Sequence, residues 1–396
     1  MRLRRWGYLS LVATSLLCSG CWDSTEINQL GIVTATGIEL VNPGDPHSES
    51  RAYAQVASPS QLVNGPNGGG GPTDSKRGFV LEEGVGLTAA SSLASVQRLM
   101  SRRFFFRDRR VVIIGERFAR RGIGDLLDAM VRNPDSRFRC FLLISDGCRP
   151  SDILRMSYPL TRLPADAMVE LEESGQGVVI NAVQFVRTMT RKSDPYAMGI
   201  RIVRTTSSTQ KGMFELADVA VFKHDRMVGW LRKDAAHGFF VMQPQSDRLK
   251  LQTLDVRISS GGWITTRLIV LKKYVRLHWT SSGPSANIHL EISDDVMENS
   301  SVLSLDEVTD VRRAEQAIEN RLTTEMKATL DLLQHHYGAD CLGLGDALFS
   351  RFPTQWRKIE PHWEQVYRQM PISVSVDAHL VRSGITGRSF IKPAHS

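Results

Sequence analysis

The spacing of apolar residues switches repeatedly between two periods in the first half of the chain. Alternating polarity, or a short continuous apolar run, predicts strands over residues 27–40, 51–57, 104–106, 111–114 and 138–144. Helical spacing predicts helices over residues 88–100, 124–132, 164–173 and 181–192. Strands that alternate with helices favour an α/β layer with a mixed or partly parallel sheet.

The first of these helices has the clearest local signals. Thr88 is a good N-cap, and Leu93, Val96 and Leu99 are expected to share its buried face.

From residue 196 onwards the pattern becomes richer in β structure. A hairpin is predicted over residues 217–231, and further strands over residues 251–258, 263–271, 275–280 and 287–292. A long helix is then expected from about residue 304 to residue 336. Its apolar positions lie at steps of three, four or seven and are Val308, Val311, Ile318, Leu322, Met326 and Leu333. Two short helices around Pro353 and an alternating strand over residues 372–376 follow, with a last segment near residues 385–391.

These patterns predict the α/β class, with a mixture of α and β structure. We expect mixed sheets flanked by helices, divided among three domains. The expected divisions are an N-terminal α/β domain over residues 21–195, a β-rich middle domain over 196–295, and a C-terminal domain over 296–396 with the long helix and closing strands. Asp194-Pro195 marks the first boundary. Residues 58–76, with three prolines and four consecutive glycines, form the longest expected loop.

Residues 1–20 have the features of a lipoprotein signal peptide. Arg2, Arg4 and Arg5 precede an apolar run, and small residues lead into Cys21. A cysteine in this position is linked to diacylglycerol, becomes the first residue of the mature chain and is usually acylated further, and two or more acyl chains anchor a protein stably. The alternative is an ordinary cleaved secretory signal in which Cys21 carries no lipid.

Charge and hydropathy agree with an extracytoplasmic protein that lies on a membrane. The chain has 49 basic and 42 acidic residues, and removal of the three signal arginines leaves a small excess of 46 over 42. This excess is too small and scattered for nucleic-acid binding, but it suits a surface near anionic lipid. After the signal, no apolar segment reaches the roughly 18 residues needed to cross a bilayer.

Two further cysteines leave two structural interpretations open. A disulfide between Cys140 and Cys148 is conceivable outside the cytoplasm. Cys140 lies inside an apolar run, however, where a small buried thiol is the commoner role.

The sequence contains no convincing catalytic, cofactor or metal site. Residues 84–89 match the letters of a dinucleotide fingerprint, but such an isolated match is usually a strand-to-helix turn. His335 and His336 near Cys341 point to different sides of a helix end and favour a solvated C-terminus over a metal site. The chain is therefore expected not to be an enzyme and to need no cofactor or metal.

Two other groups of residues are expected to have non-catalytic roles. Trp356 and Trp363 lie seven residues apart across Pro361 and are expected to pack together as structural residues. A dense group of arginines is expected to form a solvated edge, with contact to lipid headgroups or an acidic partner as the alternative. Its members are Arg102, Arg103, Arg107, Arg109 and Arg110.

Several passages, in order, resemble the Ger(x)C spore germination lipoproteins, the C subunits of nutrient germinant receptors. The passages are Gly20-Cys21-Trp22-Asp23, residues 32–38, Ser101-Arg102-Arg103, residues 112–116, the hairpin 218–231, Asp340 to Gly345, Arg351-Phe352-Pro353, Trp356-Arg357 and Trp363. The chain departs from the family pattern at Arg107-Asp108-Arg109, where Gly-His is common, and at Cys18 in the lipobox. The resemblance covers nearly the whole mature chain.

The resemblance implies a three-domain, non-catalytic lipoprotein on the outer face of the spore inner membrane. It implies association with two integral membrane subunits of A and B type, in a complex that responds to a small-molecule nutrient. The rival interpretation is a lipid-anchored solute-binding protein of a transport system. That class predicts two similar lobes around a hinge, whereas this chain has a helix-rich first half, a β-rich middle and no internal repeat.

Overall fold

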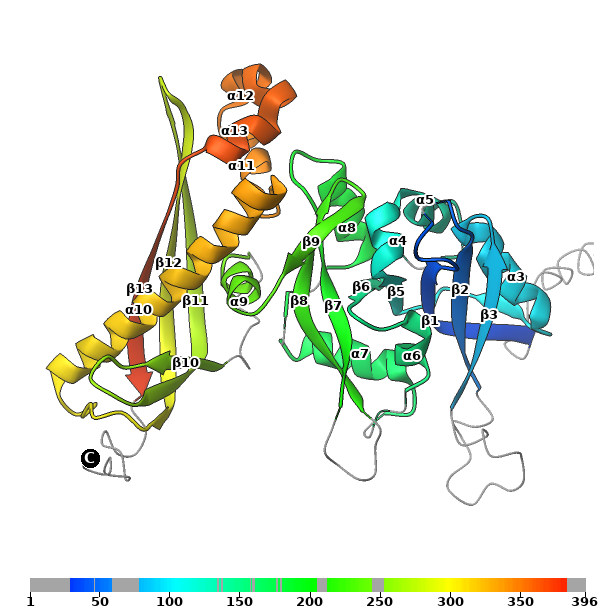
Figure 1. The fold of residues 1–396 in the computed structure, drawn as a ribbon, viewed down its shortest axis with the longest axis horizontal. Helices are drawn as coiled ribbons and strands as arrows, with labels where there is room; N and C mark the ends of the chain where they lie inside the picture. The colour runs from blue at the N-terminus through cyan, green and yellow to red at the C-terminus, as the bar shows by residue number, and fades with distance from the viewer. Residues whose placement is uncertain are drawn as a thin grey trace, which may run out of the picture.

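The computed structural model describes residues 29–382 with internal gaps at residues 46, 59–77, 134, 137, 157, 159–160, 176, 179, 205–211 and 244–252. Two sheets dominate the described part, and they lie at opposite ends of its long axis (Figure 1). The mixed α+β class expected from the sequence is confirmed.

The first sheet has nine strands in the spatial order β3-β2-β1-β5-β6-β7-β8-β9, with β4 paired to β1. The strands are β1 (Leu30–Leu40), β2 (Ser50–Ala57), β3 (Phe79–Gly86), β4 (Arg103–Phe105), β5 (Val111–Gly115), β6 (Phe141–Ser145), β7 (Tyr196–Val203), β8 (Met213–Lys223) and β9 (Arg226–Leu231). The neighbours β1, β5, β6 and β7 are parallel, and both flanks of the sheet are antiparallel. β5 and β6 are buried along almost their whole length, as is typical of central parallel strands with continuous apolar runs.

In the described part of the chain, six helices accompany the first sheet. They are α3 (Ala89–Leu99), α4 (Glu116–Arg121), α5 (Gly124–Arg132), α6 (Pro150–Leu154), α7 (Pro164–Glu173) and α8 (Ala182–Met189). Thr88 caps α3 through a capping box, as its sequence position predicts. Leu99, however, is 66% exposed, so its expected place on the buried face is wrong. The Gln97 side chain instead bonds the backbone of Arg102 and Phe104 at this end of the helix.

The second sheet has four strands in the order β10-β11-β12-β13. They are β10 (Thr253–Arg257), β11 (Trp263–Thr280), β12 (Gly283–Asn299) and β13 (Ile372–Arg382). The two strands predicted over residues 263–271 and 275–280 are therefore one long strand. Lys272 and Lys273 interrupt the apolar pattern but not the strand, because Lys273 Nζ reaches across to donate to the carbonyl of Met242 at 2.6 Å.

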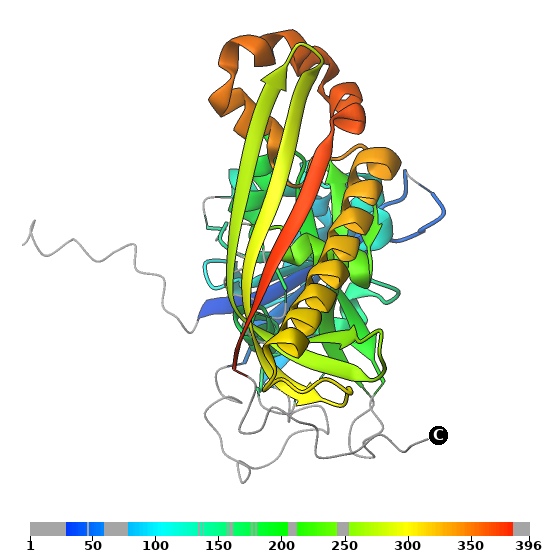
Figure 2. The same cartoon turned by 90° about the vertical axis from the view of Figure 1, so that its left-hand side faces the viewer.

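A long helix, α10 (Val308–Asp331), lies diagonally across one face of the second sheet (Figure 2) and continues as a π-helical turn over Leu332–Tyr337. Ile318, Leu322 and Met326 are buried, as their spacing predicts. Val308 is 79% exposed, so its predicted burial is wrong. A helical side chain covers the turn that precedes it, and Val308 begins the helix and has no such turn to cover.

Four shorter α-helices and one 3-10 turn (Glu360–His362) complete the described fold. The α-helices are α9 (Asp234–Val241), α11 (Leu344–Arg351), α12 (Pro353–Ile359) and α13 (Trp363–Gln369). α9 connects the two ends of the molecule (Figure 1) because its successive residues enter different cores. Phe239 and Phe240 pack in the core of the first sheet, and Val241 packs in the core of the second.

The expected boundary at residue 195 lies inside the first sheet. β6 and β7 stand on either side of this position in the sequence, and they pair in parallel from Leu143↔Met198 to Ser145↔Ile200. The division into three domains stays a prediction. Among the described residues, no helix is both long and apolar enough to cross a bilayer.

Candidate functional site

Cys21, the expected lipidation site, precedes the described residues, which begin at residue 29. Its assignment stays a prediction. The remaining signature residues lie in the described part, where their contacts can be followed.

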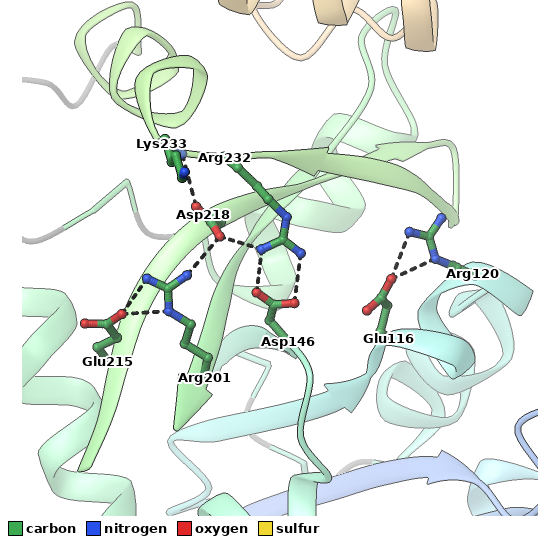
Figure 3. A network of polar contacts seen from close by, with 8 residues as sticks. All are labelled: Glu116, Arg120, Asp146, Arg201, Glu215, Asp218, Arg232 and Lys233. Atoms are coloured by element: carbon green, nitrogen blue, oxygen red, sulfur yellow. Dashed lines mark hydrogen bonds and ion pairs between the residues drawn. The ribbon is translucent and has the colours of Figure 1, made fainter. Parts of the chain in front are cut away.

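A network of charged side chains lies where β7, β8 and β9 approach the loop after β6 (Figure 3). Asp218 is at its centre, with its side chain only 7% exposed. Arg232 Nη1 donates to Asp218 Oδ2 at 2.7 Å, and its two terminal nitrogens donate to the Asp146 carboxylate at 2.7 and 2.9 Å. Arg201 Nη1 donates to the same Asp218 oxygen at 3.3 Å and its Nε donates to Glu215 at 2.7 Å.

The backbone of Asp218 is strained, with φ of +61°, a region that few side-chain-bearing residues occupy. The contacts around Asp218 compensate for this strain. The N–H of Lys233 donates to Oδ1 at 3.3 Å, so both carboxylate oxygens have donors. The hydrogen bond from Arg232 to Asp146 raises the pKa of the guanidinium. The network therefore holds the middle of β8 and the end of β9 against the start of α9, and both Asp218 oxygens are occupied by donors.

A separate ion pair on α4 lies beside this network (Figure 3). Arg120 and Glu116 are one helical turn apart and approach to 2.8 Å. Because both side chains are partly exposed, this pair contributes little stability.

A second polar cluster joins the chain before β7 to the loop after the long helix. Asp340 Oδ1 accepts from the N–H of Leu344 at 3.0 Å, and its Oδ2 accepts from the N–H of Gly345 at 2.6 Å. The N–H of Asp340 donates to Asp194 Oδ2 at 3.0 Å, and the N–H of Asp194 donates to the carbonyl of Asp340 at 3.0 Å. Complete burial raises the pKa of Asp340 to about 7. We call this cluster the 194/340 joint.

The β8–β9 hairpin reaches the same joint. The N–H of His224, in the hairpin turn, donates to Asp194 Oδ1 at 3.2 Å. Further along, a Cβ on Gly229 would lie 2.3 Å from the ring of Tyr337, so only glycine allows this approach. The Tyr337 hydroxyl donates to the carbonyl of Trp230 at 2.9 Å. Two signature segments far apart in the sequence, 218–231 and 340–345, are therefore neighbours in the fold.

The two signature tryptophans are also in contact. The ring centroids of Trp356 and Trp363 are 5.0 Å apart, and Trp356 is 1% exposed. Both pack in a small core with Leu348 and Tyr367, beneath α11, α12 and α13. Their expected structural packing is confirmed.

The fingerprint-like residues 84–89 form a strand-to-helix turn, as expected. They connect β3 to α3, and β3 is an antiparallel edge strand instead of the central parallel strand that a dinucleotide site requires. A Cβ on Gly84 would lie 2.6 Å from the backbone of Val96, so this glycine allows close packing of the helix on the strand.

The histidine pair and the cysteines have structural positions. His335 and His336 are exposed, and Cys341 is buried with its thiol against the carbonyl of Pro195 at 3.4 Å. No group of three potential metal ligands occurs among the described residues. In the same part of the chain, Cys140 and Cys148 form no disulfide with each other, and Cys140 is completely buried, so the interpretation as a small buried thiol is confirmed.

The arginine group is only partly the solvated edge that its charge pattern suggests. Arg102, Arg103 and Arg107 are exposed, and Arg110 is partly exposed and ion-paired with Asp166 at 2.8 Å. Arg109 is only 4% exposed, so the prediction is wrong for this residue. Its position between β4 and β5 turns the side chain under the sheet-covering helices, where it donates to Ser136 Oγ at 2.7 Å. Charge density along a sequence does not show which residue of the group turns inward.

Comparison with known proteins gives consistent matches along the chain. Residues 23–202 match the profile described as spore germination protein N-terminal domain, and residues 217–384 match that described as spore germination B3/GerAC like, C-terminal. YfkR of Bacillus subtilis (strain 168) is 25% identical over 374 residues, which cover 93% of this chain and 94% of YfkR. Spore germination protein KC of the same organism is 23% identical over 402 residues, which cover 95% of each chain.

A solved structure supports the same fold. The crystal structure of the GerBC protein superposes with a TM-score of 0.54 and 15% identity, covering 88% of this chain and 98% of GerBC. Together the two family profiles cover most of the chain, including the hairpin and the 194/340 joint. The chain therefore belongs to the GerAC-like family of spore germination proteins, the Ger(x)C family that its sequence resembles.

Proposed function

We propose that this protein is a lipid-anchored, non-catalytic subunit of a spore nutrient germinant receptor. Cys21 carries the lipid, and the folded chain lies on the outer face of the spore inner membrane. Two integral membrane subunits of A and B type are its partners there. The observation that carries the proposal is the match of both family domains, one after the other, over residues 23–202 and 217–384.

The contacts of three aspartates in the two polar clusters support a role in binding instead of catalysis. Asp218, Asp194 and Asp340 accept hydrogen bonds from arginines or backbone N–H groups that hold the fold. A carboxylate used in this way positions strands and loops. A protein built on such contacts acts through the surfaces it presents to other molecules.

The proposed anchor gives these surfaces their effect. Two acyl chains confine the protein to the plane of the membrane and raise its effective concentration toward embedded partners. Modest contacts with those partners can then hold an assembly together.

Deletion of the gene tests the proposal. Spores of the deletion strain should lose the response to one nutrient while still germinating under very high pressure, a trigger that does not need the receptor. An unchanged nutrient response, in a strain without a duplicate receptor, would contradict the proposal.

Replacement of the anchor cysteine tests the role of confinement. A Cys21→Ala strain should respond partially, and its defect should grow as expression falls, because the contacts remain but their enhancement is lost. Cys148→Ser, which also removes a thiol but leaves the signal peptide intact, is the matched control and should respond normally. Co-purification from detergent-solubilised spore membranes separates the alternatives, since a bound permease would favour the solute-binding class.

A further inference from the structure

A cavity of about 740 Å³ lies between α3, α5 and the face of the first sheet that they cover. Its volume is within the range of small-molecule sites in proteins. Thr36 and Ile38 of β1, Ala52 of β2 and Val112 of β5 contribute to the lining on the sheet side. This cavity lies against one face of the first sheet, and no residue of the Asp218 network or the 194/340 joint lines it.

The helices leave this space open because they present short side chains to it. Ala89, Ala90 and Ala94 of α3 and Ala129 of α5 line the cavity. Phe104 and Phe106 add aromatic surface from the segment around β4. The lining is mostly apolar, so it suits the apolar body of a ligand.

Arg109 is the buried charge in this lining. Its Nη2 donates to Ser136 Oγ at 2.7 Å, and its guanidinium lies over the Phe106 ring at 5.5 Å from the centroid. The Nε donor is buried and has no hydrogen-bond partner among the described residues. Burial lowers the pKa of Arg109, yet a guanidinium stays protonated in proteins. The Cys140 side chain supports the charged form, but no carboxylate of the described residues does so. A buried charge without an opposite charge is costly, and an anion in the cavity would offset that cost.

The other charges of the lining restrict the kind of anion. Asp125 and Asp128 of α5 line the same cavity, and Asp128 accepts from Arg132 at 2.6 Å. Within the described part of the chain, neither aspartate forms an ion pair with Arg109. Two nearby carboxylates repel a multiply charged anion more strongly than a singly charged one.

We propose that this cavity binds a small molecule with one carboxylate and an apolar body, with the carboxylate on Arg109 and the body between α3 and α5. A carboxylate is the natural acceptor for a guanidinium in the lining, and the mostly apolar surroundings strengthen such a charge-assisted hydrogen bond. The proposal goes beyond the proposed receptor role and does not depend on it, because binding is measured on the purified chain.

The test uses the full chain purified in detergent and two probes, hexanoate and 3-phenylpropionate. Calorimetric titration should show saturable binding of at least one probe, and the corresponding neutral amide should bind about ten- to a hundredfold more weakly. Arg109→Met should weaken carboxylate binding by a similar factor, because the charge-assisted hydrogen bond is lost while the volume is kept.

Two further variants keep the test decisive. Arg103→Met removes the same charge from an exposed side chain outside the cavity and should bind the probes as the parent does. Ala129→Phe fills the cavity, leaves every charged residue unchanged and should abolish binding of both probes. This variant tests the cavity even if Arg109→Met does not fold. Absence of saturable binding for both carboxylates would overturn the proposal. Equal binding of acid and amide, or unchanged binding by Ala129→Phe, would overturn it as well.

Discussion

At the scale of single residues, Trp356 is a clear case of a signature residue with a packing role. Its indole is completely buried against Trp363, in a core formed by three short helices. Truncation of a buried tryptophan leaves a cavity and exposes its neighbours. The same reasoning gives a smaller effect for Trp363, which is only partly buried.

We therefore expect Trp356→Ala to lower the free energy of unfolding by about 3–5 kcal/mol. Trp363→Ala should lower it by less. Urea denaturation of the parent and both variants, followed by circular dichroism, measures these differences. Equal and negligible effects of both substitutions would show that the indoles are not held as the fold indicates.

Asp340 gives a prediction for pH dependence. Its pKa is raised to about 7 in the folded state, mainly by burial. The folded chain therefore keeps a proton that the unfolded chain has released, so this residue makes the protein less stable as pH rises from about 4 to about 7. Below about pH 4 the carboxyl group is protonated in both states, and the stability that Asp340 contributes is then fully present. Burial also raises the pKa values of Asp194 and Asp294, which act in the same direction.

The substitution Asp340→Asn should remove this part of the pH dependence. An amide side chain cannot titrate, so the loss of stability between about pH 4.5 and pH 7.5 should become smaller by an amount on the order of a few kcal/mol. The variant will be less stable overall, because an amide oxygen alone cannot replace both carboxylate acceptors. The informative quantity is the slope of unfolding midpoint against pH in parent and variant. Parallel slopes would mean that Asp340 titrates normally.

At the scale of elements, the contact between α9 and α10 sets how the two sheets are joined. Gly238 of α9 lies against α10 so closely that a Cβ would be 2.4 Å from the carbonyl oxygen of Glu325. Thr329 of α10 donates to the carbonyl of Ala235 at 2.8 Å, and His237 bonds Glu325 at 2.5 Å. Two of the three obstructing atoms belong to the backbone of Glu325, and the third is the Thr329 hydroxyl oxygen. Because the backbone atoms cannot turn aside, a larger residue can enter only if the helices separate.

Gly238→Ala should therefore destabilise the protein, although alanine is the better helix former by about 1 kcal/mol. We expect a loss of about 1–3 kcal/mol, as for other overpacked sites. Gly44→Ala is the matched control, since its Cβ would meet only the Asn42 side chain at 3.5 Å. Thermal melting of both variants measures the difference. A stabilised Gly238→Ala protein would contradict the close approach of the two helices.

At the scale of the whole molecule, attachment to the membrane is expected to depend on a single residue. Cys21→Ala removes the thiol that we propose as the acceptor of diacylglycerol, so the variant should lose both lipid attachment and lipoprotein-type cleavage. The loss of two acyl chains should move it out of the detergent phase in a phase-partitioning experiment. Metabolic labelling with a palmitate analogue gives the second measurement. If the variant is labelled as strongly as the parent, Cys21 is not the residue that carries the lipid.

Local pattern alone predicted most of the elements, because period and capping are properties of neighbouring residues. Thr88 predicted the start of α3, and the apolar runs of β5 and β6 predicted buried strands. The pattern failed where a side chain is used in an unusual way. Lys273 interrupts the apolar pattern of β11, so the pattern predicted two strands there. Its long side chain carries the ammonium group away from the strand to the carbonyl of Met242.

Family membership and the absence of recognisable catalytic motifs were also accessible from the sequence, because both depend on ordered residue identities. The burial of Arg109 and the meeting of Asp194, Asp340 and the β8–β9 hairpin were decided only by tertiary structure. Asp194 and Asp340 are separated by 146 positions, and no local periodicity carries information across that distance. Arg109 carries the same charge as the arginines beside it in the sequence and lies in the same polar stretch. Only the packing of α3 and α5 over the sheet places it in the lining of a cavity.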